Sequence, residues 1–271
     1  MIRSGVWVVS SYSKRCDWLT ELLDDEMRQN AMGKDVDALN SGDVYNSPPN
    51  NVLLNHQVLD RCRLLLDVGA GTGSNLRVIR SRNQEVKFFA LSCSRLEAAE
   101  LSTISEEVVV IDLERLQNAE DLAKIGLSEY QFDVILMSHV LEHLRCPEDI
   151  VRVMGSVLKF DGKILIALPN ICHWRMRIKH LLGHFDYEES GIMDKSHLRF
   201  FSFWSALDVL SKCDSLVVES HYSVGGAILG PLRKILPSFF ETRIDSWCAK
   251  QFPNFFGYET HLVVAKKGID L

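Results

Sequence analysis

The sequence contains no apolar run approaching the roughly 20 residues of a membrane-spanning helix. Its first apolar run, Val6–Val9, is too short for the hydrophobic region of a secretory signal peptide. We therefore expect a soluble protein that is not exported and has no stable membrane anchor.

Cys-x-x-Cys pairs are also absent, and the 7 cysteines lie far apart in the sequence. Because their number is odd, at least one has no partner for an intrachain disulfide, which favours the reducing cytoplasm.

Basic residues are not in excess, since 30 Lys and Arg stand against 36 Asp and Glu for a net charge of −6. Without a basic stretch that could follow a phosphate backbone, nucleic acid is not expected as a partner. With only 7 Pro and 16 Gly, disordered and collagen-like chains are excluded.

The chain does contain enough apolar residues, 46% of 271, for a large core. Short apolar runs alternate with helical or loop stretches, as in a series of βαβ units, and the clearest helix is expected over 147–160. These runs predict a doubly wound, seven-stranded, mostly parallel α/β sheet, with strands at 62–68, 86–91, 108–111, 132–137, 163–168, 216–219 and 261–265.

Two segments are predicted outside this sheet. Residues 14–32 have a helical pattern and a cluster of helix-breaking residues follows at 46–51, so residues 1–60 are expected to form an N-terminal helical segment or lid, and residues 61–271 the main domain. An insertion at about 225–257 is rich in Leu and Phe. Its apolar surface could be covered by the core, by a second subunit in a homodimer, or by a lipid-like or aromatic substrate.

A glycine loop follows the first predicted strand. Asp67 precedes Gly69, Gly71 and Gly73, and such glycines let the chain turn into a helix while a ligand approaches the backbone. The Gly-x-Gly-x-Gly spacing differs from the dinucleotide fingerprint, because position 74 is Ser. A carboxylate at Asp67 would repel a pyrophosphate and attract an ammonium group. S-adenosylmethionine carries such an ammonium group, whereas NAD does not.

With this loop, the stretch from about Leu64 to Lys267 resembles the class I S-adenosylmethionine-dependent methyltransferases, and in particular their small-molecule bacterial members. The resemblance implies an enzyme with S-adenosylmethionine or S-adenosylhomocysteine as its cofactor. In that family the loop lies under the methionine part, an acid after the second strand holds the ribose, and an Asp after the third strand faces the adenine. The cofactor residues it implies here are Asp67, Gly69, Gly71, Gly73, Ser92, Asp112, Leu113 and Ser138.

The ribose position departs from the family pattern, because Ser92 stands where the family has an acid. A hydroxyl makes one hydrogen bond where a carboxylate makes two, so we expect the contact to be weaker by about 1–3 kcal/mol. On this basis Ser92→Asp should preserve or tighten cofactor binding. The same departure keeps open a non-catalytic, methyltransferase-like binding protein.

A His-x-x-Glu-His segment, His139 to His143, follows the fourth predicted strand, and its two histidines are expected to share a helix face. One alternative is a zinc-dependent hydrolase in which His139 and His143 bind the metal and Glu142 is the base. The other is the turn beside the methyl group, where related methyltransferases carry a similar segment. We favour the second alternative and assign no metal ligand. Some quinone-pathway methyltransferases that this segment resembles bind a divalent ion there through Glu-x-x-Glu-His, and His139 stands here in the first position, so the resemblance leaves a bound ion open.

The resemblance implies transfer of a methyl group to a small molecule or glycan, and we expect oxygen as the acceptor atom. A hydroxyl acceptor must lose its proton, and a histidine with a pKa near 6.5 suits that task. The candidate bases are His139, His143, His173 and His197, and the sequence does not choose among them.

Overall fold

The computed structural model describes residues 47–227 and 237–268. The helix expected over 14–32 and most of the expected lid, residues 1–60, lie outside these residues and stay predictions. The described part of the lid contains the short helix α2 (Asn51–Leu54) and the 3-10 turn η2 (Gln57–Arg61).

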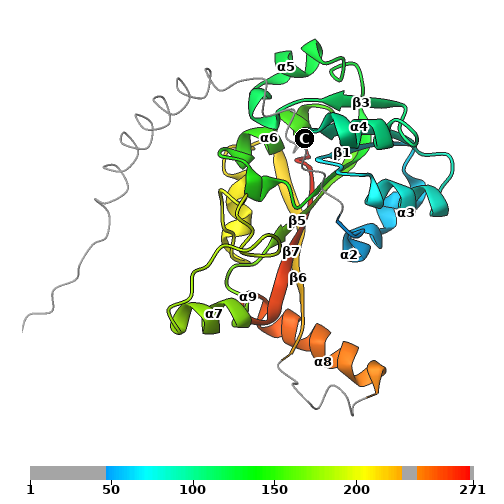
Figure 1. Cartoon of the computed structure of the whole chain (residues 1–271). Coiled ribbons are helices and arrows are strands. Elements are labelled where there is room, and N and C mark those ends of the chain that lie inside the picture. The colour runs from blue at the N-terminus through cyan, green and yellow to red at the C-terminus, as the bar shows by residue number, and fades with distance from the viewer. Residues whose placement is uncertain (1–46, 228–236, 269–271) are drawn as a thin grey trace, which may run out of the picture. The chain divides into compact units, whose positions relative to one another are not determined.

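A seven-stranded sheet in the order β3-β2-β1-β4-β5-β7-β6 forms the centre of the fold (Figure 1). β1 to β5 pair in parallel, whereas β7 is antiparallel to both of its neighbours. The predicted doubly wound, mostly parallel sheet is therefore confirmed. Its strands are β1 (Leu64–Val68), β2 (Lys87–Ser92), β3 (Glu107–Val110), β4 (Phe132–Ser138), β5 (Leu158–Pro169), β6 (Leu216–Gly225) and β7 (Gly257–Lys266).

Apolar residues cover both faces of the sheet, which explains why the central strands read as continuous apolar runs. Alternate residues of β1 illustrate this, since Leu66 belongs to one buried cluster and Leu65 to the other. The cluster containing Leu66 includes α6 (Pro147–Ser156), and the cluster containing Leu65 includes α2 and α3 (Ser74–Arg82). The sheet is thus a rigid middle layer whose strand ends can hold a site.

The remaining described helices are α4 (Arg95–Leu101), α5 (Ala119–Lys124), α7 (Trp174–Leu181), α8 (Ser238–Gln251) and α9 (Pro253–Phe256), with 3-10 turns η3 (Leu113–Arg115), η4 (Leu141–His143) and η5 (Ser205–Leu210). The helix predicted over 147–160 ends at Ser156, and residue 158 already belongs to β5. Leu158 pairs with Phe132 of β4, so strand pairing overrides the helical pattern there.

Strands β6 and β7 are joined by a connection whose described part contains α8 and α9. It lies where β5 and β6 end and β7 begins (Figure 1). Several of its aromatic side chains are exposed, including Phe239, Phe240 and Trp247. Within residues 47–227 and 237–268, no helix has the length and apolar character needed to cross a membrane. None of the six cysteines in this part of the chain forms a disulfide with another of them.

Candidate active site

A cavity of about 390 Å³ opens at the carboxyl ends of β1, β2 and β4. This is the edge at which α/β sheets of this topology bind ligands. Both polar and apolar groups line it: Ser47, Pro48, Gly69, Ala70, Gly71, Ser74, Asn75, Leu91, Ser92, Cys93, Glu97, Asp112, Leu113, Glu114, Ser138, His139, Val140, His143, Leu144 and Ser196.

The glycine loop between β1 and α3 forms the floor of this cavity. Gly69 has a φ of +71°, and a Cβ atom at this position would lie 2.5 Å from Cγ2 of Val140. Gly73 has a φ of +83° and caps the start of α3. Both positions require a glycine, for the left-handed backbone and, at Gly69, for the close approach of Val140. Gly69 and Gly71 line the cavity as expected, whereas Gly73 is outside its lining.

Asp67, near the end of β1, lies beneath the loop rather than in the cavity lining, and only 1% of it is exposed. Its Oδ2 atom has no hydrogen-bond partner among the described residues. Burial removes the carboxylate from water and raises its pKa to about 7. The expected direct contact with an ammonium group stays a prediction, but a buried acid with an unsatisfied oxygen is what such a contact requires.

Ser92, at the end of β2, does line the cavity, but its hydroxyl is already engaged. It donates a 2.6 Å hydrogen bond to Oε2 of Glu97 and accepts one of 2.9 Å from the backbone N–H of Ser94. Glu97 is 2% exposed and also lines the cavity. The end of β2 therefore carries no acidic residue, but Glu97 in the first turn of α4 places a carboxylate beside it.

This geometry reverses the expectation for Ser92→Asp. A carboxylate at position 92 would stand against the buried carboxylate of Glu97, and like charges this close repel strongly at a buried site. We therefore expect that substitution to weaken the site rather than tighten it.

The other residues expected at the cofactor lie on the opposite walls. Asp112 caps η3 by accepting a 3.0 Å hydrogen bond from the N–H of Glu114, and both residues line the cavity together with Leu113. Ser138, the last residue of β4, completes the set on the other side. The structure thus brings six of the eight expected residues into one cavity lining, and leaves Asp67 and Gly73 just outside it.

His139 follows β4 in a left-handed conformation, with a φ of +56°. Its Nδ1 atom lies 3.2 Å from Oε1 of Glu142 and its Nε2 atom 3.1 Å from Oε1 of Glu259. Burial alone would lower the pKa of His139, but the hydrogen bonds to the two carboxylates raise it to about 10. Burial likewise opposes ionisation of Glu259, while the bonds from His139 and His261 lower its pKa to about 2. His139 is therefore a cation at neutral pH, and both of its ring nitrogens are engaged.

The His-x-x-Glu-His segment does not form the expected helix. It folds as the 3-10 turn η4, and the next helix begins at Pro147. With both nitrogens of His139 bound to carboxylates, the pair of ligands expected for a zinc hydrolase is not assembled. A left-handed residue at position 139 is the local cause, because it turns the chain before a helix can start.

His143, in contrast, lines the cavity and is connected to a loop that is distant in the sequence. Its Nδ1 atom lies 3.1 Å from Oγ and 3.3 Å from the carbonyl oxygen of Ser196. The Ser196 hydroxyl donates a 2.5 Å hydrogen bond to Oδ1 of Asp194. Because a carbonyl can only accept, Nδ1 of His143 carries the hydrogen, which makes Nε2 the acceptor nitrogen in the neutral form of the ring.

The two remaining candidate bases do not line the cavity. His173 precedes α7 and is 6% exposed, and burial together with the charge of Arg175 lowers its pKa to about 4. His197 is 8% exposed, and its Nδ1 atom lies 3.1 Å from the carbonyl oxygen of Ile192. Burial lowers the pKa of His197, although Glu142 opposes this.

Sequence reasoning missed Glu97, Glu259 and the Asp194–Ser196 link. Ser94 and Glu97 have the spacing of an N-terminal capping box, which would explain the acid as a helix cap. In the structure Ser94 makes no side-chain cap, and Glu97 turns to Ser92 instead. The predicted last strand began at residue 261, so Glu259 lay outside it, and only the longer strand β7 shows this glutamate as a buried residue that needs a partner.

A family model described as a methyltransferase domain matches residues 42–207, more than half of the chain. This stretch contains β1 to β5, the glycine loop and the turn η4. A search of curated proteins finds no match.

Solved structures with a similar fold were also found. An S-adenosylmethionine-dependent methyltransferase from Archaeoglobus fulgidus is 18% identical with a TM-score of 0.52, over 78% of this chain and 88% of that one. PKMT2 from Rickettsia typhi is 12% identical with a TM-score of 0.53, over 83% and 55% of the two chains. An O-methyltransferase family protein from Burkholderia thailandensis is 14% identical with a TM-score of 0.50, over 80% and 55%. At these identities the likeness is one of fold.

Proposed function

Because the chain belongs to the methyltransferase-domain family, we propose that it methylates a hydroxyl oxygen of a small molecule or glycan, with S-adenosylmethionine as the donor and His143 as the base. The observation that carries this proposal is the hydrogen-bonded series His143–Ser196–Asp194 at the wall of the cavity. It supplies a fixed proton acceptor, which methylation of a hydroxyl requires.

The cavity fits the donor in three respects. Its volume, about 390 Å³, is in the range of small-molecule sites. Gly69 and Gly71 of the glycine loop line it, so a ligand can approach the backbone closely there. Beneath that loop, Asp67 holds a buried oxygen that an ammonium donor would satisfy. When bound, S-adenosylmethionine supplies an electrophilic methyl group on a charged sulfur.

The polar residues of the walls suit the rest of the donor. We assign the ribose hydroxyls to Glu97, since a carboxylate accepts hydrogen bonds from both hydroxyls and the Ser92 hydroxyl is already used. Asp112 keeps its assignment to the adenine amino group, with Leu113 against the ring and Ser138 near the methionine end.

His143 is chosen over the other candidate histidines for two reasons. It lines the cavity, which His173 and His197 do not. Its hydrogen bonds to Ser196 involve Nδ1, which makes Nε2 the acceptor of the neutral ring, whereas His139, the other histidine in the lining, has a pKa raised to about 10 and both nitrogens bound to carboxylates. Ser196 holds the imidazole in one tautomer, and Asp194 holds Ser196 in turn. Removal of such a base typically slows proton transfer by a factor of about 10²–10⁴.

The test compares His143→Gln with His184→Gln, a substitution of an exposed histidine whose side chain contacts Asp186. Radiolabelled S-adenosylmethionine would be incubated with phenols, sugar alcohols, amines and thiols, and labelled product would be counted. We expect product from a hydroxyl-bearing probe, a loss of at least about 100-fold in His143→Gln, and no loss in His184→Gln.

Binding of S-adenosylhomocysteine would be measured for the same proteins by calorimetry. His143→Gln should still bind it, because His143 acts on the acceptor. Labelled product only from amines or thiols would contradict oxygen as the acceptor atom. Cofactor binding without transfer to any probe would support the non-catalytic alternative.

A further inference from the structure

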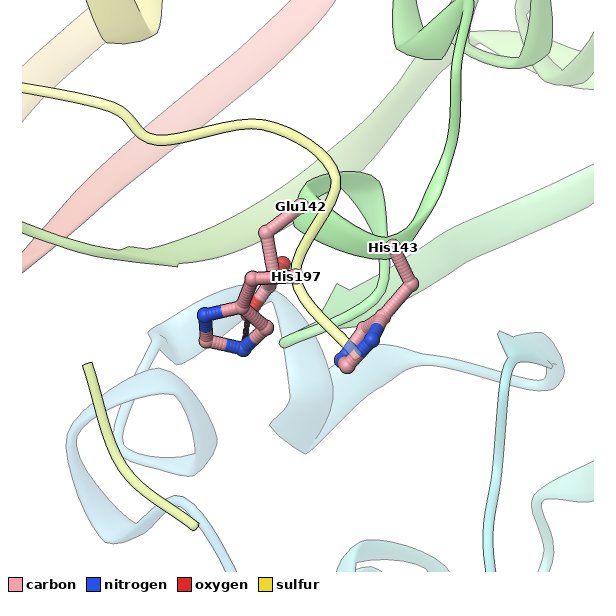
Figure 2. A group of neighbouring side chains, drawn as sticks. All are labelled: Glu142, His143 and His197. Carbon is pink, nitrogen blue, oxygen red and sulfur yellow. Dashed lines mark ion pairs between the residues drawn. The ribbon is translucent and has the colours of Figure 1, made fainter. Parts of the chain in front are cut away.

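Three side chains with metal-ligating atoms meet behind the wall that His143 forms. One ligand atom each of Glu142, His143 and His197 lies within 4.8 Å of the other two (Figure 2). Glu142 and His143 come from the turn η4, and His197 comes from a loop more than 50 residues later. Glu142 is 0% exposed and His197 8%, so these two are shielded from bulk water, whereas His143 is half-buried and faces the cavity.

The hydrogen bonds of the two histidines orient both rings through their Nδ1 atoms. Nδ1 of His197 lies 3.1 Å from the carbonyl oxygen of Ile192, and Nδ1 of His143 lies 3.3 Å from that of Ser196. Each Nδ1 is therefore the donor in these bonds, so in the neutral tautomer of each ring Nε2 is the nitrogen that could ligate a metal. A histidine that ligates a metal is oriented in the same way, with its other nitrogen donating to a carbonyl or carboxylate.

The candidate ligand atoms lie close to one another. Nε2 of His197 lies 3.9 Å from Oε1 of Glu142, and that oxygen is also contacted by Nδ1 of His139. Oε2 of Glu142 is buried and has no hydrogen-bond partner among the described residues. A buried carboxylate oxygen without a donor is costly, and a cation between it and the two imidazoles would remove that cost.

The backbone holds these parts together. The carbonyl oxygen of Glu142 accepts hydrogen bonds from the N–H groups of Leu198, at 2.8 Å, and Arg199, at 2.9 Å. These bonds fix the loop that carries His197 against the turn that carries Glu142. The ligand atoms of a tetrahedral ion lie about 3.3–3.6 Å apart, given bonds of about 2.0–2.2 Å. Side-chain rotations that move each ligand atom by about 1 Å would therefore bring the three atoms to these distances.

We propose that Glu142, His143 and His197 bind one divalent transition-metal ion of the Zn²⁺ type, with two nitrogen ligands and one oxygen ligand. Two imidazoles and a carboxylate favour Zn²⁺, Co²⁺ or Fe²⁺ over Mg²⁺ and Ca²⁺, which prefer oxygen ligands. This set differs from that of the zinc-hydrolase alternative, because His139 is not in it and Glu142 is a ligand rather than a base. Three protein ligands leave a coordination position open, as in catalytic rather than structural zinc sites.

Metal binding and proton acceptance at Nε2 of His143 exclude one another. Bound Zn²⁺ should therefore slow any transfer in which His143 takes the proton. The existence of the metal site itself does not depend on the acceptor or on the methyl donor, so it is tested by binding alone.

The experiment uses the full chain, treated with a chelator and dialysed against Zn²⁺, Co²⁺ or Mg²⁺. We expect one Zn²⁺ per chain, visible absorption bands with Co²⁺, and no retention of Mg²⁺. Glu142→Gln and His197→Gln should each weaken Zn²⁺ binding by about 100-fold or more, because each removes a ligand. The control His184→Gln should bind Zn²⁺ as the unchanged chain does.

Folding of each variant is checked by circular dichroism and by its binding of S-adenosylhomocysteine, whose site does not include Glu142 or His197. The unchanged chain failing to retain Zn²⁺ would overturn the proposal. So would a folded His197→Gln variant that binds Zn²⁺ with unchanged affinity, since the ion would then lie elsewhere. Either result would leave the proposed methyl transfer standing.

Discussion

Replacing Asp67 by Asn should stabilise the protein and at the same time remove its cofactor binding. Asp67 is buried, and desolvation raises its pKa from an ordinary value of 3.8 to about 7. The folded state therefore holds a proton that the unfolded state has lost between about pH 4 and pH 7. Stability falls as the pH rises through this window and stays low above it.

The size of the effect follows from the shift in pKa. Each pKa unit is worth about 1.4 kcal/mol, so three units set an upper limit of about 4 kcal/mol on the penalty above pH 7. Asn removes the charge but brings an amide whose buried polar atoms also need partners, at a cost of about 1–3 kcal/mol. We expect Asp67→Asn to be more stable than the unchanged chain by about 1–3 kcal/mol at pH 8, and less stable or equal at pH 4.

Urea denaturation followed by circular dichroism at pH 4, 6 and 8 measures this difference. Asp133→Asn is the matched control of opposite sign. Burial would raise the pKa of Asp133, but hydrogen bonds from Lys159 and two backbone N–H groups lower it, so its charge stabilises the fold. That variant should lose stability at pH 8. A difference between Asp67→Asn and the unchanged chain that is the same at pH 4 and pH 8 would refute the reasoning.

Three further substitutions test the walls of the site. Gly69→Ala should lower the melting temperature and abolish binding of S-adenosylhomocysteine in a calorimetric titration, because its Cβ would strike Val140 and its φ is strained; unchanged binding would mean that the loop is not the floor of the site. Ser92→Asp should weaken the same binding by at least about 10-fold, because its carboxylate would face Glu97, and tighter binding would contradict the position of that acid. Glu259→Gln removes the charge of a buried carboxylate that pairs with a protonated histidine, so thermal denaturation should show a loss of about 1–3 kcal/mol, whereas a neutral result would show that the pair adds no stability.

The fold could be predicted because its signals are local. Each buried parallel strand is a short apolar run, and glycines directly after such a strand indicate the turn at which sheets of this kind bind ligands. The end of α6 could not be predicted, since residues 157–160 fit the helical pattern, whereas in the structure β5 begins at Leu158, which pairs with Phe132 of β4. Similarly, nothing local in His139–His143 indicates that residue 139 would adopt a left-handed conformation.

The site was only partly predictable, because its chemistry depends on contacts between distant residues. The family resemblance predicts that His143 lies near the methyl group. The sequence cannot show that Ser196, 53 residues later, contacts Nδ1 of His143 and so fixes its tautomer. The sequence also suggests that the site lacks the acidic residue expected at the ribose, whereas Glu97 places a carboxylate next to Ser92, five residues later in the chain. His139 and His143 lie only four residues apart in the same segment. The two carboxylates that contact His139 nevertheless raise its pKa to about 10, which the sequence does not indicate.

A calorimetric titration of the full chain with S-adenosylhomocysteine tests the central claim most directly, that the cavity above Asp67 receives this cofactor. We predict one site per chain, with binding lost in Asp67→Asn although that variant is folded and more stable at pH 8. Absence of binding at millimolar ligand by the folded, unchanged chain, or equal binding by Asp67→Asn, would contradict it.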